Sequence, residues 1–166
     1  MTSRTNGFER ITGTCVTPRL VAGATPSVSF SGATSATMDS GRGGFGGSFP
    51  FVLGCGAGTA VVGFQIDTTR PGVISALNLR CAPVAVSASG AGYAVPRGTV
   101  VDGPGTGTDP FSGGTPTYGA ATDCPATNGF ASGFASGFAG RIVDPGFGGT
   151  THAAFGLTCT ALSITP

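Results

Sequence analysis

The sequence contains no tryptophan and no lysine, and it has a single histidine, His152, and a single glutamate, Glu9. Charged residues make up 9% of the chain and are scattered along it, giving a formal net charge of +1. Nucleic-acid binding needs clustered basic residues, so nucleic acid is not expected as a partner. One histidine excludes a metal site built from several histidines, and no G-x-S-x-G nucleophile motif occurs. We therefore expect a protein that is not an enzyme and has no cofactor or metal.

Long uninterrupted segments are also scarce. The longest stretch without glycine or proline is residues 73–82. An amphipathic helix needs about ten or more periodic residues with a capped start, so helices have little room. No apolar run approaches the roughly 20 residues that span a bilayer, and membrane insertion is not expected.

Glycine and proline are abundant, with 31 and 12 residues respectively. Short apolar runs such as 49–53 and 59–64 stand between glycine clusters, which is typical of strands joined by tight turns. Hydrophobic residues make up 40% of the chain, whereas disordered chains combine low hydrophobicity with high charge. The sequence predicts a single all-β domain over residues 1–166 with long glycine-rich loops.

Three segments that end at Cys15, Cys81 and Cys159 share one pattern, and we call them the closing segments. Apolar residues stand four and two positions before the second and third of these cysteines, and four positions before the first. A period of two places alternate residues on one face of a strand. The pattern therefore predicts three equivalent strands that bury this face. The residues concerned are Ile11, Leu77, Leu79, Phe155 and Leu157.

The segments around Cys55 and Cys124 form a second repeated element. An aromatic residue stands six positions before each cysteine, and a Gly-Phe pair follows each one. Together with the closing segments, this predicts repeat units at about 16–81 and 82–159. Residues 1–15 and 160–166 then form part of a third unit. The aromatic residues are Phe49 and Tyr118, and the pairs are Gly63-Phe64 and Gly133-Phe134.

Five cysteines in a chain of this size predict disulfides and an oxidising compartment. The spacing favours the bridges Cys55–Cys81 and Cys124–Cys159, each joining two strands of one unit. Cys15 is left over, either as a free thiol inside the protein or bonded to another chain. We expect an extracellular or cell-surface location, although residues 1–10 contain no secretory signal peptide.

From Gly63-Phe64 to the closing segment 76–81, the chain resembles the vitelline membrane outer layer protein I family. The shared features are a cysteine, a glycine-rich turn, a Gly-Phe strand and a closing strand that reads ALNLRC here. The resemblance implies a β-prism of three Greek-key sheets, and an extracellular coat role or glycan binding. The alternatives are a two-sheet sandwich and a prism completed between subunits.

Two function classes remain open. The first is a structural subunit of a coat, sheath or filament, which associates with identical subunits through β-edges and glycine-rich loops. The second is a lectin-like module that binds extracellular glycans. Its carboxylates would accept hydrogen bonds from sugar hydroxyls, and its tyrosines would stack on sugar rings. The candidate glycan contacts are Tyr93, Asp102, Asp109, Tyr118 and Asp144.

Three weaker patterns have mainly structural interpretations. Cys15 and His152 are conceivable as a nucleophile and its base, but both belong to closing segments. Asp102 and Asp109 lie in a loop that would suit Ca²⁺ only with a further carboxylate. Residues 129–140 repeat a Gly-Phe-Ala motif, which we interpret as strand and loop with exposed phenylalanines that form a packing surface.

Overall fold

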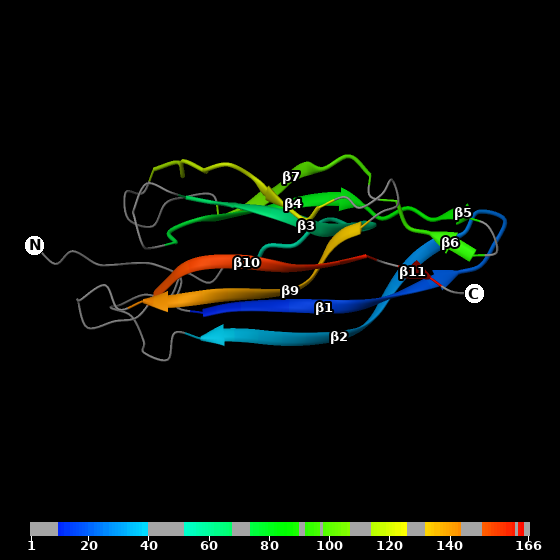
Figure 1. Ribbon diagram of the computed structural model, residues 1–166, viewed down its shortest axis with the longest axis horizontal. Helices are drawn as coiled ribbons and strands as arrows, with labels where there is room; N and C mark the ends of the chain where they lie inside the picture. Colours follow the sequence, from blue (N-terminus) through cyan, green and yellow to red (C-terminus); the bar gives the residue numbers. More distant parts are fainter. Residues whose placement is uncertain are drawn as a thin grey trace, which may run out of the picture.

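The computed structural model describes residues 10–39, 52–67, 74–89, 92–96, 98–106, 114–125, 132–143, 151–161 and 163–164. Within these ranges the chain forms eleven strands and no helix, so the all-β class is confirmed (Figure 1). The segment around Leu77 is a strand, as the period of two predicts.

The strands belong to four separate antiparallel sheets. Two are long hairpins, β1-β2 and β10-β9, one has four strands in the order β7-β4-β3-β8, and one has three in the order β11-β6-β5. Figure 1 shows the hairpins running lengthwise beside the four-stranded sheet, with the small sheet at the end near the C-terminus. The strands are β1 Arg10–Val21, β2 Ser27–Asp39, β3 Thr59–Ile66, β4 Leu77–Pro83, β5 Ser87–Ser89, β6 Gly92–Ala94, β7 Val101–Gly105, β8 Thr122–Asp123, β9 Ser132–Val143, β10 Thr151–Ala161 and β11 Ser163–Ile164.

The main core lies on one face of the four-stranded sheet. Leu77, Leu79 and Cys81 of β4 are buried there with Phe64 and Ile74, so the predicted phase of this strand is confirmed. Partly buried residues from both hairpins pack against the same cluster. These are Ile11 of β1 and Phe155 and Leu157 of β10.

Aromatic rings connect the sheets across this core. Phe155 meets Phe64 edge to face, with ring centroids 4.9 Å apart, and stacks with Phe138 at 6.3 Å. Offset stacking and edge-to-face contact are the arrangements that aromatic pairs favour. The Phe138 ring occupies the space where a Cβ on Gly13 would stand, so the glycine lets β1 approach β9.

A second, smaller core contains Val62, Ala82, Val95 and Phe134. Phe134 is only 2% exposed and Phe138 is half-buried, so the phenylalanines of β9 that the structure describes do not form a surface patch. The expectation of exposed phenylalanines was wrong here, because Phe134 packs against Val62 and Ala82 of the four-stranded sheet, and Phe138 packs against Phe155 and beside Gly13 of β1. Phe130 lies outside the described residues.

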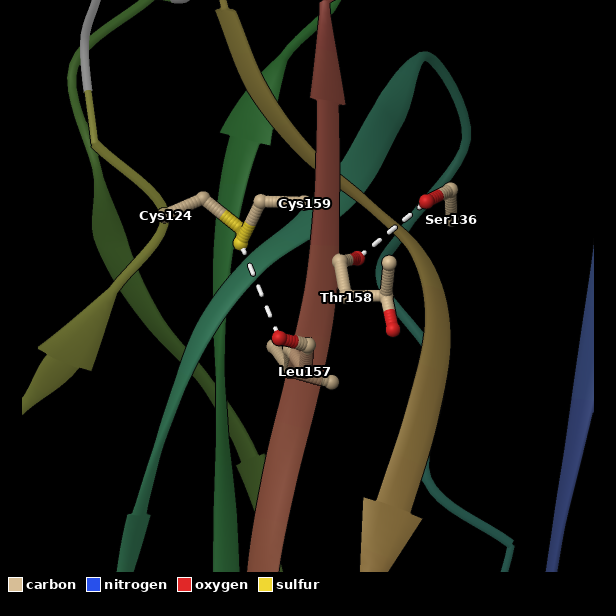
Figure 2. Close-up of a disulfide and its surroundings, with 5 residues drawn as sticks. All are labelled: Cys124, Ser136, Leu157, Thr158 and Cys159. Atoms are coloured by element: carbon tan, nitrogen blue, oxygen red, sulfur yellow. Dashed lines mark hydrogen bonds between the residues drawn. A yellow bond between two sulfur atoms is a disulfide. The ribbon is translucent and has the colours of Figure 1, made fainter.

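Both expected disulfides are present. Cys55 pairs with Cys81 and Cys124 with Cys159, with Cα atoms 5.7 and 5.6 Å apart respectively. Figure 2 shows the second bridge joining β10 to the residue after β8. Cys15 is a free, half-buried thiol.

The strand ends differ from the sequence prediction in three places. β1 continues to Val21, so Cys15 lies within its strand rather than at the end. Val52 and Leu53 are not in a strand, and residues 43–51 lie outside the described residues. Tyr118 forms only an isolated bridge with Asp67. In the first case β2 supplies pairing partners beyond Cys15, and this extends β1.

Candidate functional site

The second face of the four-stranded sheet carries most of its polar side chains. Alternation along β4 points Leu77 and Leu79 to the main core and Asn78 and Arg80 to the opposite face. Gln65 of β3 is the partner of Asn78, and Asp102 of β7 and Asp123 of β8 are the partners of Arg80. We call this surface the polar face and treat it as the candidate site.

Arg80 is the centre of an ion-pair cluster on the polar face. Its Nε donates to Asp123 Oδ1 at 2.6 Å, and its Nη2 donates to Asp123 Oδ2 at 3.2 Å. Its Nη1 donates to Asp102 Oδ1 at 2.6 Å. The cluster therefore joins β4 to β7 on one side and to β8, across β3, on the other. One guanidinium and two carboxylates leave a net negative charge on this part of the sheet.

The three side chains differ in exposure. Arg80 is 19% exposed and Asp123 28%, whereas Asp102 is 66% exposed. The hydrogen bonds to Asp123, together with the charges of both aspartates, raise the pKa of Arg80. The guanidinium therefore stays charged under ordinary conditions, and the exposed Asp102 is the carboxylate best placed to meet a ligand.

Gly63 lies opposite Arg80 in β4 and next to Asp123 in β8. A Cβ at position 63 would stand 2.7 Å from the Thr122 carbonyl oxygen and 2.9 Å from the Asp123 Cα. These are backbone atoms that cannot turn aside. Glycine at this position is what allows β8 to approach β3 and deliver Asp123 to Arg80.

A hydrogen-bond chain continues the polar face beside the ion pairs. Asn78 Nδ2 donates to Gln65 Oε1 at 3.0 Å, and Gln65 Nε2 donates to the Gly119 carbonyl at 3.2 Å. Gly105 brings β7 close here, because a Cβ on it would lie 2.8 Å from the Tyr118 hydroxyl and 3.1 Å from Asn78 Oδ1. Amide, hydroxyl and carboxylate groups thus share one surface.

Among the predicted glycan contacts, the structure brings Asp102 and Tyr118 to this same face. Tyr93 lies in β6, which belongs to the separate three-stranded sheet. Asp109 and Asp144 lie outside the described residues. The five candidates therefore do not form one described site, and only Asp102 and Tyr118 lie on the same face.

Cys15 and His152 are not brought together. The Cys15 thiol lies 3.6 Å from the Ser136 carbonyl oxygen, whereas the backbone of His152 pairs with Ile142. Ser136 and Ile142 are six positions apart in β9, which is roughly 20 Å along a strand. A cysteine nucleophile with a histidine base is therefore not assembled.

Sequence reasoning missed Arg80, Asp123, Gln65 and Asn78 as parts of a site. The available signal was the period of two in the closing segment 76–81, which places Asn78 and Arg80 opposite the buried leucines. The pairing with Asp123 depends on the sheet register across β3, which the sequence pattern does not contain.

The polar face is suited to hydrogen bonding rather than to acid–base chemistry, because its carboxylates are engaged by a permanently charged arginine. No group of three or more metal-ligating side chains occurs among the described residues. The described part of the chain also has no helix that could span a bilayer.

Fold and site together define an all-β protein with two disulfides and a polar sheet face. Two disulfides are typical of an oxidising, extracellular environment. Comparison with protein-family models, curated proteins and solved structures gave no match to this chain.

Proposed function

We propose that the protein is a non-enzymatic, extracellular structural subunit of a coat, sheath or filament that associates with identical copies. Association would use open β-edges, with glycine-rich loops adding contacts. The observation that carries this proposal is the edge of β2. This strand of 13 residues pairs only with β1 among the described residues. An edge strand of this length is a template for another strand.

The edges of the four-stranded sheet are less suited to pairing than β2. In the four-stranded sheet, the edge strands β7 and β8 have five and two residues, and β7 carries Asp102 and Pro104. Short length, charge and proline are the features that protect an edge from pairing. Residues 27–38 contain no charge and no proline. A formal net charge of +1 also gives little repulsion between copies.

We further propose a prism-like arrangement of repeated units, in line with the resemblance to the vitelline membrane outer layer protein I family. Its support is the contact of all three closing segments with one core. Ile11, Leu79 and Leu157 come from β1, β4 and β10 and pack in the same cluster. The closing segment at the start of β1 would then belong to the incomplete unit, formed by residues 1–15 and 160–166 and open to completion by another chain.

Size-exclusion chromatography with light scattering, followed by negative-stain microscopy, tests the proposed function. We expect a mass that rises with protein concentration and particles or polymers with a regular repeat. A monodisperse monomer over the whole concentration range would contradict self-association. Measurements with the Cys15→Ser variant separate strand pairing from adventitious disulfides between copies.

A lectin-like module is the second candidate, favoured by the shared face of Asp102 and Tyr118. Binding to a glycan array would support it. We then expect Asp102→Asn and Tyr118→Ala to abolish the signal, whereas Tyr93→Ala, in the separate sheet, would leave it unchanged. A silent array together with regular polymers would exclude this candidate.

A further inference from the structure

We propose that residues 33–39 of β2, here called the β2 arm, pair antiparallel with the β2 arm of a second copy across a two-fold axis centred on Ala36. The inference rests on the proposed self-association and names its contact surface. It places the pairing in the C-terminal half of the β2 edge, in the register in which Ala36 faces Ala36.

Within the β2 arm, residues 33–37 are accessible from the edge and from both faces. Residues 31–37 are all exposed, although alternation in a half-buried strand would cover every second one. Their side chains are Ser, Gly, Ala and Thr, so no bulky group shields the backbone. A second strand can therefore approach the N–H and C=O groups of this edge, which have no partner among the described residues, without rearrangement of the hairpin.

Hydroxyl groups of β1 and β2 already form a regular ladder on the outer face of the hairpin. The hydroxyl oxygens of Thr12 and Thr37 are 3.0 Å apart, and those of Thr14 and Ser35 are 3.2 Å apart. Each hydroxyl has one donor and two acceptor positions, so a pair leaves capacity for a further contact. The ladder stops at β2 only because the described residues provide no next strand.

A two-fold axis at Ala36 extends this ladder through the second copy. Position 35 then faces position 37 of the copy, and Ser35 meets Thr37 twice, once on each side of the axis. Each row would run from Thr14 and Ser35 in one copy to Thr37 and Thr12 in the other. The new contact would therefore be joined by the same kind of hydroxyl pairs that already join β1 to β2.

The centre and the ends of the arm also fit this register. Ala36 faces Ala36, which places the smallest chiral side chain at the axis. Asp39 is opposite position 33 of the copy, so the two aspartates stand at opposite ends of the contact. Gly32, with a φ of +63°, forms a bulge where the β1 register shifts. A bulge bends the strand and raises its twist, which limits the pairing to the arm.

Cysteine cross-linking tests the register. In a Cys15→Ser background, Ala36→Cys places two thiols at directly opposite positions, where Cβ atoms are about 5 Å apart. We expect a covalent dimer on mild oxidation. Ala33→Cys is the matched control, an exposed alanine of the same strand that does not face itself. Equal cross-linking of both variants, or none at position 36, would overturn the register.

Charge reversal tests the surface independently. Ala36→Lys and Ala36→Glu should each weaken association about fivefold, because like charges would face one another across the axis. An equimolar mixture should recover association. Circular dichroism and the two native disulfides report that the variants are folded.

The outcomes separate this inference from the proposed function. If the wild-type protein assembles and Ala36→Lys assembles equally well, the β2 arm is not the contact, and the structural role stands. If the wild-type protein is monomeric at every concentration, the structural role fails and the pairing fails with it.

Discussion

Gly63 shows at the residue scale how a missing side chain sets the distance between strands. Gly63→Ala should lower the free energy of unfolding by roughly 1–3 kcal/mol, because the new methyl group meets the backbone of β8. Urea denaturation followed by circular dichroism measures the change. Gly156→Ala is the matched control, since a Cβ at that strand position meets no atom within 4 Å. A loss as large at Gly156 as at Gly63 would contradict the steric explanation.

The aspartates that flank Arg80 should contribute unequally to stability. Asp123→Asn removes the less exposed carboxylate, which accepts two of the three hydrogen bonds, and should cost roughly 1.5–3 kcal/mol. Asp102→Asn should cost less than about 1 kcal/mol, because this pair is exposed to solvent. Chemical denaturation of both variants in parallel measures the two losses of unfolding free energy. Equal losses would contradict the unequal contributions of Asp123 and Asp102.

The raised pKa of Arg80 fixes the sign of its pH dependence. A group whose pKa is higher in the folded state stabilises the fold at every pH below its ordinary value. That contribution is lost only as the pH rises through the alkaline range where arginine deprotonates. Arginine itself therefore introduces no stability change between acid and neutral pH.

At the element scale, the positions of the strands were more predictable from the sequence than the pairing between strands. The period of two before Cys81 correctly placed Leu77 and Leu79 in the core, because side-chain alternation is a local property. Which strands pair depends on contacts between residues far apart in sequence, such as Arg80 and Asp123. The candidate site could therefore be predicted only in part: Asp102 and Tyr118 stood out as chemical types, whereas the ion-pair cluster did not.

The disulfide between Cys124 and Cys159 should be a major stabilising contact of the C-terminal hairpin. It closes a separation of 35 residues, for which the chain-entropy model gives about 3–4 kcal/mol. Replacing both cysteines by serine should lower the thermal midpoint of unfolding strongly. Cys15→Ser should change it little, because among the described residues this thiol donates only to the Ser136 carbonyl, at 3.6 Å. If Cys15→Ser lowered the thermal midpoint as much as removal of the disulfide, the Cys124–Cys159 bridge would not be the major stabilising contact.

At the scale of the whole molecule, Phe155 links the four-stranded sheet to the hairpins. Phe155→Ala removes ring contacts with Phe64 and Phe138 and should cost roughly 3 kcal/mol or more. Val52→Ala, at a side chain 96% exposed, should stay within about 0.5 kcal/mol of the wild type. Guanidinium unfolding curves provide both values. A small loss for Phe155→Ala would show that the sheets are held together elsewhere.

The two disulfide loops, 55–81 and 124–159, follow one another along the chain, and the β1-β2 hairpin lies outside both. Under a pulling force applied at its N-terminal end, this hairpin can unzip one ladder bond at a time, whereas the covalent loops cannot lengthen. The β1-β2 hairpin would therefore unfold under force, whereas the segments inside the two disulfide loops would not lengthen. Under the proposed structural role, such a subunit would extend without breaking, and single-molecule stretching should record a low-force extension followed by an abrupt limit.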